Sequence, residues 1–130
     1  MKAIEISIEN YTKALNKLIE GINQANDELD RDGVLQRFEF TFELFWKTLK
    51  LILKYEGFEC RSPRSCIKEA FEKDYIVDSE TFLDMLEDRN LSSHVYDEKI
   101  SLEIYERIKN IYLVKFVDSS KSFQDYVRNL

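Results

Sequence analysis

The sequence predicts an all-α protein, an up-and-down antiparallel bundle of about five helices that is similar to a four-helix bundle. It has 3 glycines and 1 proline in 130 residues, which leaves little material for the turns of an all-β fold. It is 44% hydrophobic and 34% charged, unlike a disordered chain. Long stretches repeat apolar residues with a helical period. The length suits one domain, so we expect residues 1–130 to form a single bundle.

The first predicted helix spans residues 4–29, where apolar residues are spaced alternately four and three positions apart. This spacing gives one apolar stripe and suits near-parallel packing in a bundle. The stripe consists of Ile4, Ile8, Tyr11, Leu15, Leu18, Ile22, Ala25 and Leu29. The segment around Asp30, Asp32 and Gly33 interrupts the pattern, so we expect the helix to end there.

The second predicted helix spans residues 34–58 and is apolar on two faces. FEFTF alternates like a strand, but no turn signal interrupts the run before Gly57, which is typical of a helix C-terminus. One face contains Leu35, Phe38, Phe42, Phe45, Leu49 and Ile52, and the other contains Phe40, Leu44, Leu51 and Tyr55. Two apolar faces indicate burial on two sides. We therefore expect a homodimer interface on the second face, with burial at the bundle centre as the alternative.

Two short helices follow. Ser62 and Pro63 are typical of the N-cap and first position of a helix that reaches about Lys73. Asp78 or Ser79 begins the next one. Its core-facing residues are Phe82, Met85 and Leu86.

The last predicted helix begins at about Ile100 and runs toward the C-terminus. Its apolar stripe contains Ile104, Ile108, Ile111 and Phe116. Residues Phe123, Tyr126 and Val127 either continue this helix or dock separately. The sequence shows no internal repeat and no linker between domains.

The net charge of −6 excludes general phosphate-driven binding of nucleic acid, and we expect no DNA partner. The charge is uneven, however. Residues 46–73 carry seven basic and four acidic side chains, whereas residues 78–106 carry nine acidic and two basic ones. The basic strip either faces a phosphate or an acidic partner, or is a solvated face with i,i+4 ion pairs.

The cysteines and the N-terminus bear on the compartment. Cys60 and Cys66 fit no zinc spacing, so we expect two free thiols, with a disulfide as the alternative, and neither a metal nor a cofactor. The N-terminus has no apolar signal region, and no apolar window is long enough to span a bilayer. We therefore expect a cytoplasmic protein with no membrane partner.

The candidate site is the stretch EDRNLSSHVYDE, residues 87–98, which contains Arg89, Asn90 and His94, the single histidine. A histidine can donate and accept a proton near neutral pH, and an arginine can hold a phosphate. Together they suit metal-independent RNA cleavage, with a homodimer supplying the second histidine. On an ideal helix the two side chains lie roughly 140° apart, so they converge only if the helix ends between them. We expect fraying near Arg89 and Asn90 and a helix end within residues 90–93, because Asn and Ser compete for backbone hydrogen bonds. The surrounding carboxylates should repel RNA.

The segments RFEFTFELFWKTLK, residues 37–50, and DMLEDRNLSSHVYDE, residues 84–98, carry a family resemblance. In this order, with a Ser-Pro helix between them and a long helix after them, they resemble the nucleotidyltransferase substrate-binding protein family of the HEPN superfamily. The likeness extends from about residue 4 to residue 118. The resemblance implies a dimeric HEPN-like helical bundle, and its usual partner is a separately encoded minimal nucleotidyltransferase.

Related pairs act as toxin–antitoxin systems, in which the HEPN protein is an RNase. The family motif falls on Arg89, Asn90 and His94. In one branch an added tyrosine, here Tyr96, is adenylylated by the partner.

The sequence therefore leaves three hypotheses. The favoured one is a subunit that binds a minimal nucleotidyltransferase and its substrate, either RNA or a nucleotide. The second is an RNase toxin that uses Arg89 and His94 across a dimer interface and is silenced at Tyr96. The third is a structural bundle without a site.

A partner or dimer interface is expected at Phe40, Glu43, Leu44 and Lys47. Glu39 and Glu43 lie one helical turn apart and repel unless a cation such as Arg37, or one from a partner, lies nearby.

Overall fold

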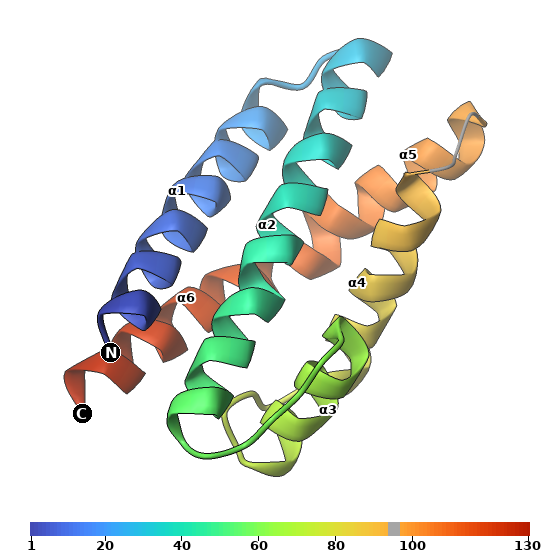
Figure 1. The fold of residues 1–130 in the computed structure, drawn as a ribbon. Helices are drawn as coiled ribbons and strands as arrows, with labels where there is room; N and C mark the ends of the chain where they lie inside the picture. Colours follow the sequence, from blue (N-terminus) through green and yellow to red (C-terminus); the bar gives the residue numbers. More distant parts are fainter. Residues whose placement is uncertain (94–96) are drawn as a thin grey trace.

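The computed structural model describes residues 1–93 and 97–130, which form helices and no strand (Figure 1). The helices are α1 (Lys2–Gln24), α2 (Glu28–Tyr55), α3 (Pro63–Glu72), α4 (Ser79–Ser92), α5 (Glu98–Arg107), the π-helix η1 (Ile108–Tyr112) and α6 (Leu113–Arg128). The last three follow one another directly and form one long rod. The predicted all-α bundle of about five helices, two of them short, is therefore confirmed.

Helix α2 is the centre of the bundle. It runs antiparallel to α1, and it also packs against α3, α4 and α5 (Figure 1). The long C-terminal rod contacts α1 through α6, and the two chain termini lie at the same end of the molecule. This arrangement puts one long side of α2 against the core and leaves the opposite side at the surface.

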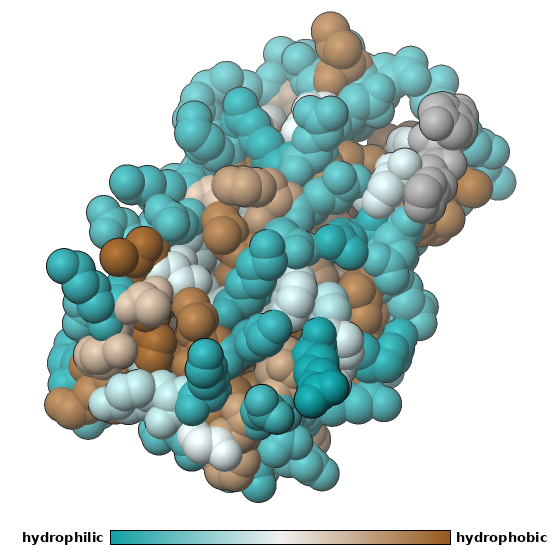
Figure 2. Space-filling model, in the orientation of Figure 1, coloured by the Kyte–Doolittle hydropathy of each residue, from teal (hydrophilic) through white to brown (hydrophobic). Residues whose placement is uncertain are grey.

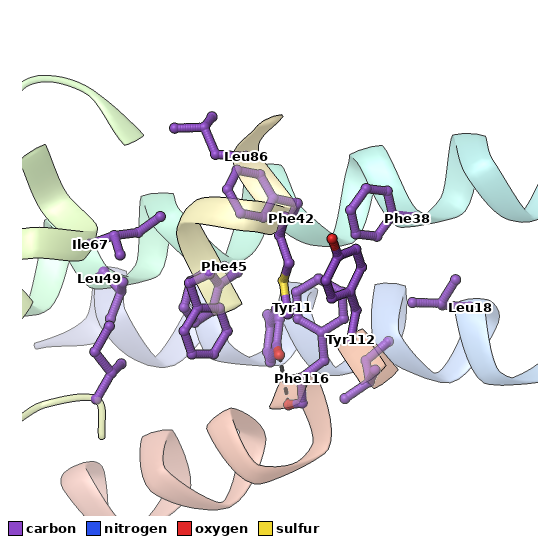
Figure 3. Packing of buried hydrophobic residues seen from close by; sticks show 14 of the residues in the cluster. Tyr11, Leu18, Phe38, Phe42, Phe45, Leu49, Ile67, Leu86, Tyr112 and Phe116 are labelled. Carbon is purple, nitrogen blue, oxygen red and sulfur yellow. Dashed lines mark hydrogen bonds between the residues drawn. The ribbon is translucent and has the colours of Figure 1, made fainter. Parts of the chain in front are cut away.

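Aromatic side chains fill the core between α1, α2 and the C-terminal rod (Figure 3). Phe38, Phe42 and Phe45 of α2 are fully buried, as the first apolar face predicts. The Tyr11 hydroxyl donates a hydrogen bond of 2.7 Å to the Phe116 carbonyl, so this buried polar group is satisfied. Burial raises the pKa of Tyr11 well above its ordinary value.

The predicted boundary between the first two helices is wrong by several residues. Helix α1 ends at Gln24, and Asp27 caps α2 by accepting a 2.8 Å hydrogen bond from the Asp30 amide. Acidic residues are favourable in the first turn of a helix, where Glu28 and Asp30 lie, so Asp30 and Asp32 are part of α2 instead of separating two helices. Leu29, expected in the first stripe, consequently lies in α2 and is 79% exposed.

The π-helix η1 corrects the predicted stripe of the last helix. Ile111 was expected in the core but is 47% exposed, and Tyr112 is buried in its place. A π turn contains more residues than an α turn. It therefore keeps Ile108, Tyr112 and Phe116, each four residues apart, on one side. Residues Phe123, Tyr126 and Val127 continue the rod in α6.

The connection from α2 to α3 confirms the predicted caps and corrects the cysteines. Gly57 follows α2 with a φ of 92°, a conformation that favours glycine, and Ser62 caps α3 with Pro63 at its first turn. Cys60 and Cys66 form a disulfide, so the expectation of two free thiols is wrong. Sequence spacing alone does not reveal how close two cysteines come in space.

Helix α4 places the candidate site at its C-terminal end. Asp78 caps it, as predicted, by accepting a hydrogen bond from the Thr81 amide. The helix continues through Arg89 and Asn90 and ends at Ser92, within the stretch 90–93 where the sequence predicts its end. In the described part of the chain, no helix combines the length and apolar composition needed to cross a bilayer.

Candidate functional site

The centre of the candidate site is an ion pair between α4 and α2. Arg89 Nη2 lies 2.5 Å from Glu43 Oε2, and both side chains are about 30% exposed. Arg89 Nη1 also donates to the side-chain oxygen of Asn90 at 3.1 Å. An arginine has five N–H donors, so a ligand at this edge would still find donors on Arg89. It would also meet the carboxylate of Glu43.

Glu43 gathers three donors around one carboxylate. The Trp46 indole Nε1 donates to Oε2 at 3.1 Å, and Lys47 Nζ lies 3.4 Å from Oε1. Burial raises the pKa of Glu43, but the Trp46 hydrogen bond and the charges of Arg89 and Lys47 outweigh it, so the net pKa lies below its ordinary value. Glu43 is therefore ionised at neutral pH.

This pairing resolves the repulsion expected between Glu39 and Glu43. The balancing cation is Arg89 of the same chain, whereas Arg37 donates its Nη1–H to the Lys17 carbonyl at 2.6 Å. Glu39 in turn accepts a hydrogen bond of 2.6 Å from the Ser92 hydroxyl. Two carboxylates of α2 thus bind side chains at the C-terminal end of α4. No cation from a partner is needed to relieve the repulsion between Glu39 and Glu43.

A second charged cluster lies directly behind the site. Asp88 is buried, and it accepts two hydrogen bonds from Arg107, Nε to Oδ2 at 2.7 Å and Nη2 to Oδ1 at 2.8 Å. The Tyr112 hydroxyl of η1 also donates to Asp88. Burial raises the pKa of Tyr112, and the hydrogen bond and charge of Asp88 raise it further. Asp88 thus joins α4 to the C-terminal rod and is not one of the carboxylates that face a ligand.

The surface beside the last turn of α4 is acidic. A hollow of about 470 Å³ lies between the beginning of α2, the end of α4 and the beginning of α5. The described residues that line it include four carboxylates, Glu28, Asp32, Glu39 and Glu98, and neither lysine nor arginine. A polyanion that approached Arg89 from this side would be repelled.

Two predicted site residues, His94 and Tyr96, lie outside the described residues. Arg89 and Asn90 lie in the last turns of α4, which ends at Ser92, and α5 begins at Glu98 with Asp97 as its cap. The helix therefore ends between Arg89 and position 94, which is the condition that the two residues need in order to converge.

The residues predicted for a partner or dimer interface separate into two groups. Phe40 is 61% exposed, Leu44 is half-buried and Lys47 is exposed, so these three lie on the outer side of α2. Glu43 turns toward α4 and is held by Arg89. The outer side of α2 is therefore free to receive a partner in the described part of the molecule.

Sequence reasoning missed the cluster of Asp88, Arg107 and Tyr112. A signal was present, because Asp88 follows Met85 by three residues and so lies in phase with the buried face of α4. A charged residue in phase with a core stripe requires a buried partner. Tyr112 likewise follows Ile108 by four residues. The described residues contain no group of three or more His, Cys, Asp or Glu side chains that could hold a metal ion.

Comparison with known proteins identifies the family. Residues 6–125 match the family described as "Nucleotidyltransferase substrate binding protein like". A crystal structure of a protein from Thermus thermophilus is similar to this chain, with a TM-score of 0.76 and 33% sequence identity. That match covers 91% of this chain and 98% of the Thermus chain.

A curated protein of Haemophilus influenzae, named "Probable ribonuclease HepT", is 26% identical over 86 residues. The alignment covers 62% of this chain and 59% of the relative, so it spans less than two thirds of that protein. Because the family match covers nearly the whole chain, this protein belongs to the nucleotidyltransferase substrate-binding protein-like family.

Proposed function

We propose that this protein is the binding subunit of a two-protein system and associates with a minimal nucleotidyltransferase. The family description supports the kind of partner. In this role the end of α4 holds a phosphate of the nucleotide or RNA that the nucleotidyltransferase uses. Arg89 and Asn90 contact the ligand, together with His94. The pair forms part of a toxin–antitoxin system.

The observation that carries the choice of a binding role over RNA cleavage is the Arg89–Glu43 ion pair. Cleavage requires an arginine whose positive charge stabilises the negative charge that develops on the phosphate in the transition state. Here an ionised carboxylate lies 2.5 Å from Arg89 and opposes that charge. Four more carboxylates line the neighbouring hollow. This environment suits selective binding of a small ligand better than tight binding of RNA.

The test is co-purification with a minimal nucleotidyltransferase, followed by light scattering to measure the mass of the complex. A stable complex that binds a nucleotide, and that loses nucleotide binding in Arg89→Ala, supports the proposal. Asp84→Ala is the matched control, because Asp84 is exposed on the same helix. If neither a complex nor nucleotide binding is detected, the proposal is wrong.

The second candidate is a metal-independent RNase toxin, which the printed name of the Haemophilus influenzae relative favours. Arg89, Asn90 and His94 of a homodimer would then form the active site, and adenylylation of Tyr96 would add a bulky negative group beside it. Mass spectrometry first verifies that Tyr96 is unmodified. RNA cleavage by the wild type that is lost in His94→Ala would establish this candidate. Cleavage by neither protein, with both still folded, leaves the binding role.

A further inference from the structure

The outer side of α2 has a surface that the fold leaves uncovered. Phe40, Leu44 and Leu51 lie four and seven residues apart, so they form one apolar strip along the helix. Phe40 is 61% exposed, and Leu44 and Leu51 are half-buried. Figure 2 shows apolar surface over α1 and α2, next to a row of hydrophilic side chains. We call this strip and its flanking cations the α2 face.

Cations flank the apolar strip on both sides. Lys47 lies in line with the strip between Leu44 and Leu51. Lys50 and Lys54 follow one edge of the strip, and Lys17 of α1 and Arg37 lie on the other edge. Lys47 forms an ion pair with Glu43, which Arg89 also binds. Among the described residues, no carboxylate forms an ion pair with Lys17, Arg37, Lys50 or Lys54. In a chain of net charge −6, this face is therefore locally basic.

A small hollow adjoins the strip. It measures about 220 Å³ and is lined by Ala14, Lys17, Gln36, Arg37 and Phe40. Its walls are largely the alanine, the phenylalanine ring and the aliphatic parts of the longer side chains. A single apolar side chain from a partner would fill this hollow while a neighbouring carboxylate meets Lys17 or Arg37.

We infer that the α2 face receives an acidic amphipathic helix of a partner protein. The helix covers Phe40, Leu44 and Leu51 with its apolar side and places carboxylates against the flanking cations. An apolar centre with a charged rim is typical of protein interfaces, and amphipathic helices bind to apolar strips in this way. The identification of the partner as the nucleotidyltransferase rests on the proposed function, whereas the binding of an acidic helix to the α2 face does not.

Charge and chemistry favour this occupant over two others. A second copy of the chain that used the same face would bring a second set of unneutralised cations into one interface. RNA would match the cations but would leave the aliphatic side chains of Leu44 and Leu51 without apolar contacts. An acidic helix satisfies both the cations and the apolar strip.

The first experiment measures binding of a synthetic peptide by fluorescence anisotropy with the full chain. The peptide is helical, with leucine on one side and glutamate on the other, and its counterpart carries lysine in place of glutamate. We expect only the acidic peptide to bind, with affinity reduced at least about tenfold in Phe40→Ser and in the double variant Lys47→Glu/Lys50→Glu. Phe71→Ser and the double variant Lys68→Glu/Lys121→Glu make the same chemical changes at exposed sites elsewhere and should bind like wild type.

The inference is wrong if the acidic peptide does not bind, if the lysine peptide binds equally well, or if the control variants lose as much affinity as the face variants. It is also overturned if wild type is a dimer that Phe40→Ser converts to monomers, since a second copy then covers the face. Single-stranded RNA that binds wild type and is lost only in Lys47→Glu/Lys50→Glu would assign the face to RNA.

The same variants, mixed with the nucleotidyltransferase, separate this inference from the proposed function. If wild type forms the complex and the face variants form it equally well, the α2 face is not the docking site, although the proposed function stands. If wild type forms no complex but binds the acidic peptide as expected, the proposed function fails and the inference about the face stands.

Discussion

Replacing Asp88 with alanine should destabilise the protein severely although it removes a single carboxylate. Asp88 is 7% exposed and accepts hydrogen bonds from Arg107 and from the buried Tyr112 hydroxyl. Leaving the Tyr112 hydroxyl without a partner costs about 1–3 kcal/mol. The Arg107 side chain is 37% exposed and recovers solvation, so its loss adds about 1 kcal/mol. We therefore expect a loss of about 2–4 kcal/mol.

Urea unfolding followed by circular dichroism measures this loss, and the thermal midpoint should fall by about 10 °C. Asp84→Ala, on the exposed side of the same helix, should change stability by less than about 0.5 kcal/mol. A further change of Tyr112→Phe in the Asp88→Ala protein removes the unpaired hydroxyl and should restore about 1 kcal/mol. A cost for Asp88→Ala as small as that of Asp84→Ala would refute the reasoning, as would a second substitution that destabilises further.

Three other predictions concern stability. Gly33→Ala should stabilise the protein by about 0.5–1 kcal/mol, because Gly33 lies inside α2 and an added Cβ meets nothing within 4 Å. Gly57→Ala should destabilise it by about 1 kcal/mol, because Gly57 has a φ of 92°. Urea unfolding that shows Gly33→Ala to be destabilising, or Gly57→Ala to be stabilising, would contradict these predictions. Reduction of the Cys60–Cys66 disulfide, which closes a loop with a sequence separation of 6, should cost about 2 kcal/mol, and an unchanged urea midpoint with reductant would show that the bond contributes nothing. The pKa of Glu43 is lower in the folded protein than in the unfolded chain, so on acidification the unfolded chain takes up this proton first. The ionised Glu43 therefore stabilises the fold above about pH 4.5, and this stabilisation is lost as the pH falls through the lower folded-state pKa. When unfolding is measured over that acid range, a Glu43→Gln protein should lose less stability than wild type.

Local signals in the sequence were reliable where local energetics decide the structure. The cap residues Ser62 and Asp78, the proline at the start of α3 and the glycine after α2 were all predicted, because capping depends on neighbouring backbone groups. The end of α1 was predicted too late because the acidic run at 30–32 was interpreted as a break. The same residues favour a helix N-terminus, and only the position of the Asp27 cap distinguishes the two interpretations.

The candidate site was found in the sequence as a motif but not as an arrangement of charges. Arg89 was chosen for its chemistry, yet nothing in its neighbours along the chain indicates Glu43, which lies 46 residues away. The π turn had no signal that we recognised, and it decides that Tyr112 and not Ile111 reaches Asp88. Both features depend on the packing of α2, α4 and the C-terminal rod.

The sequence by itself determined the fold class, the caps of α3 and α4 and the family, because apolar periodicity and capping are short-range properties and a family motif is read along the chain. The tertiary structure decided which charges neutralise one another. It paired Arg89 with Glu43 and Arg107 with Asp88, and it left the cations of the α2 face, apart from Lys47, without carboxylates. Ion pairs form between side chains that come within about 4 Å in space, and only the packing of the helices sets those distances.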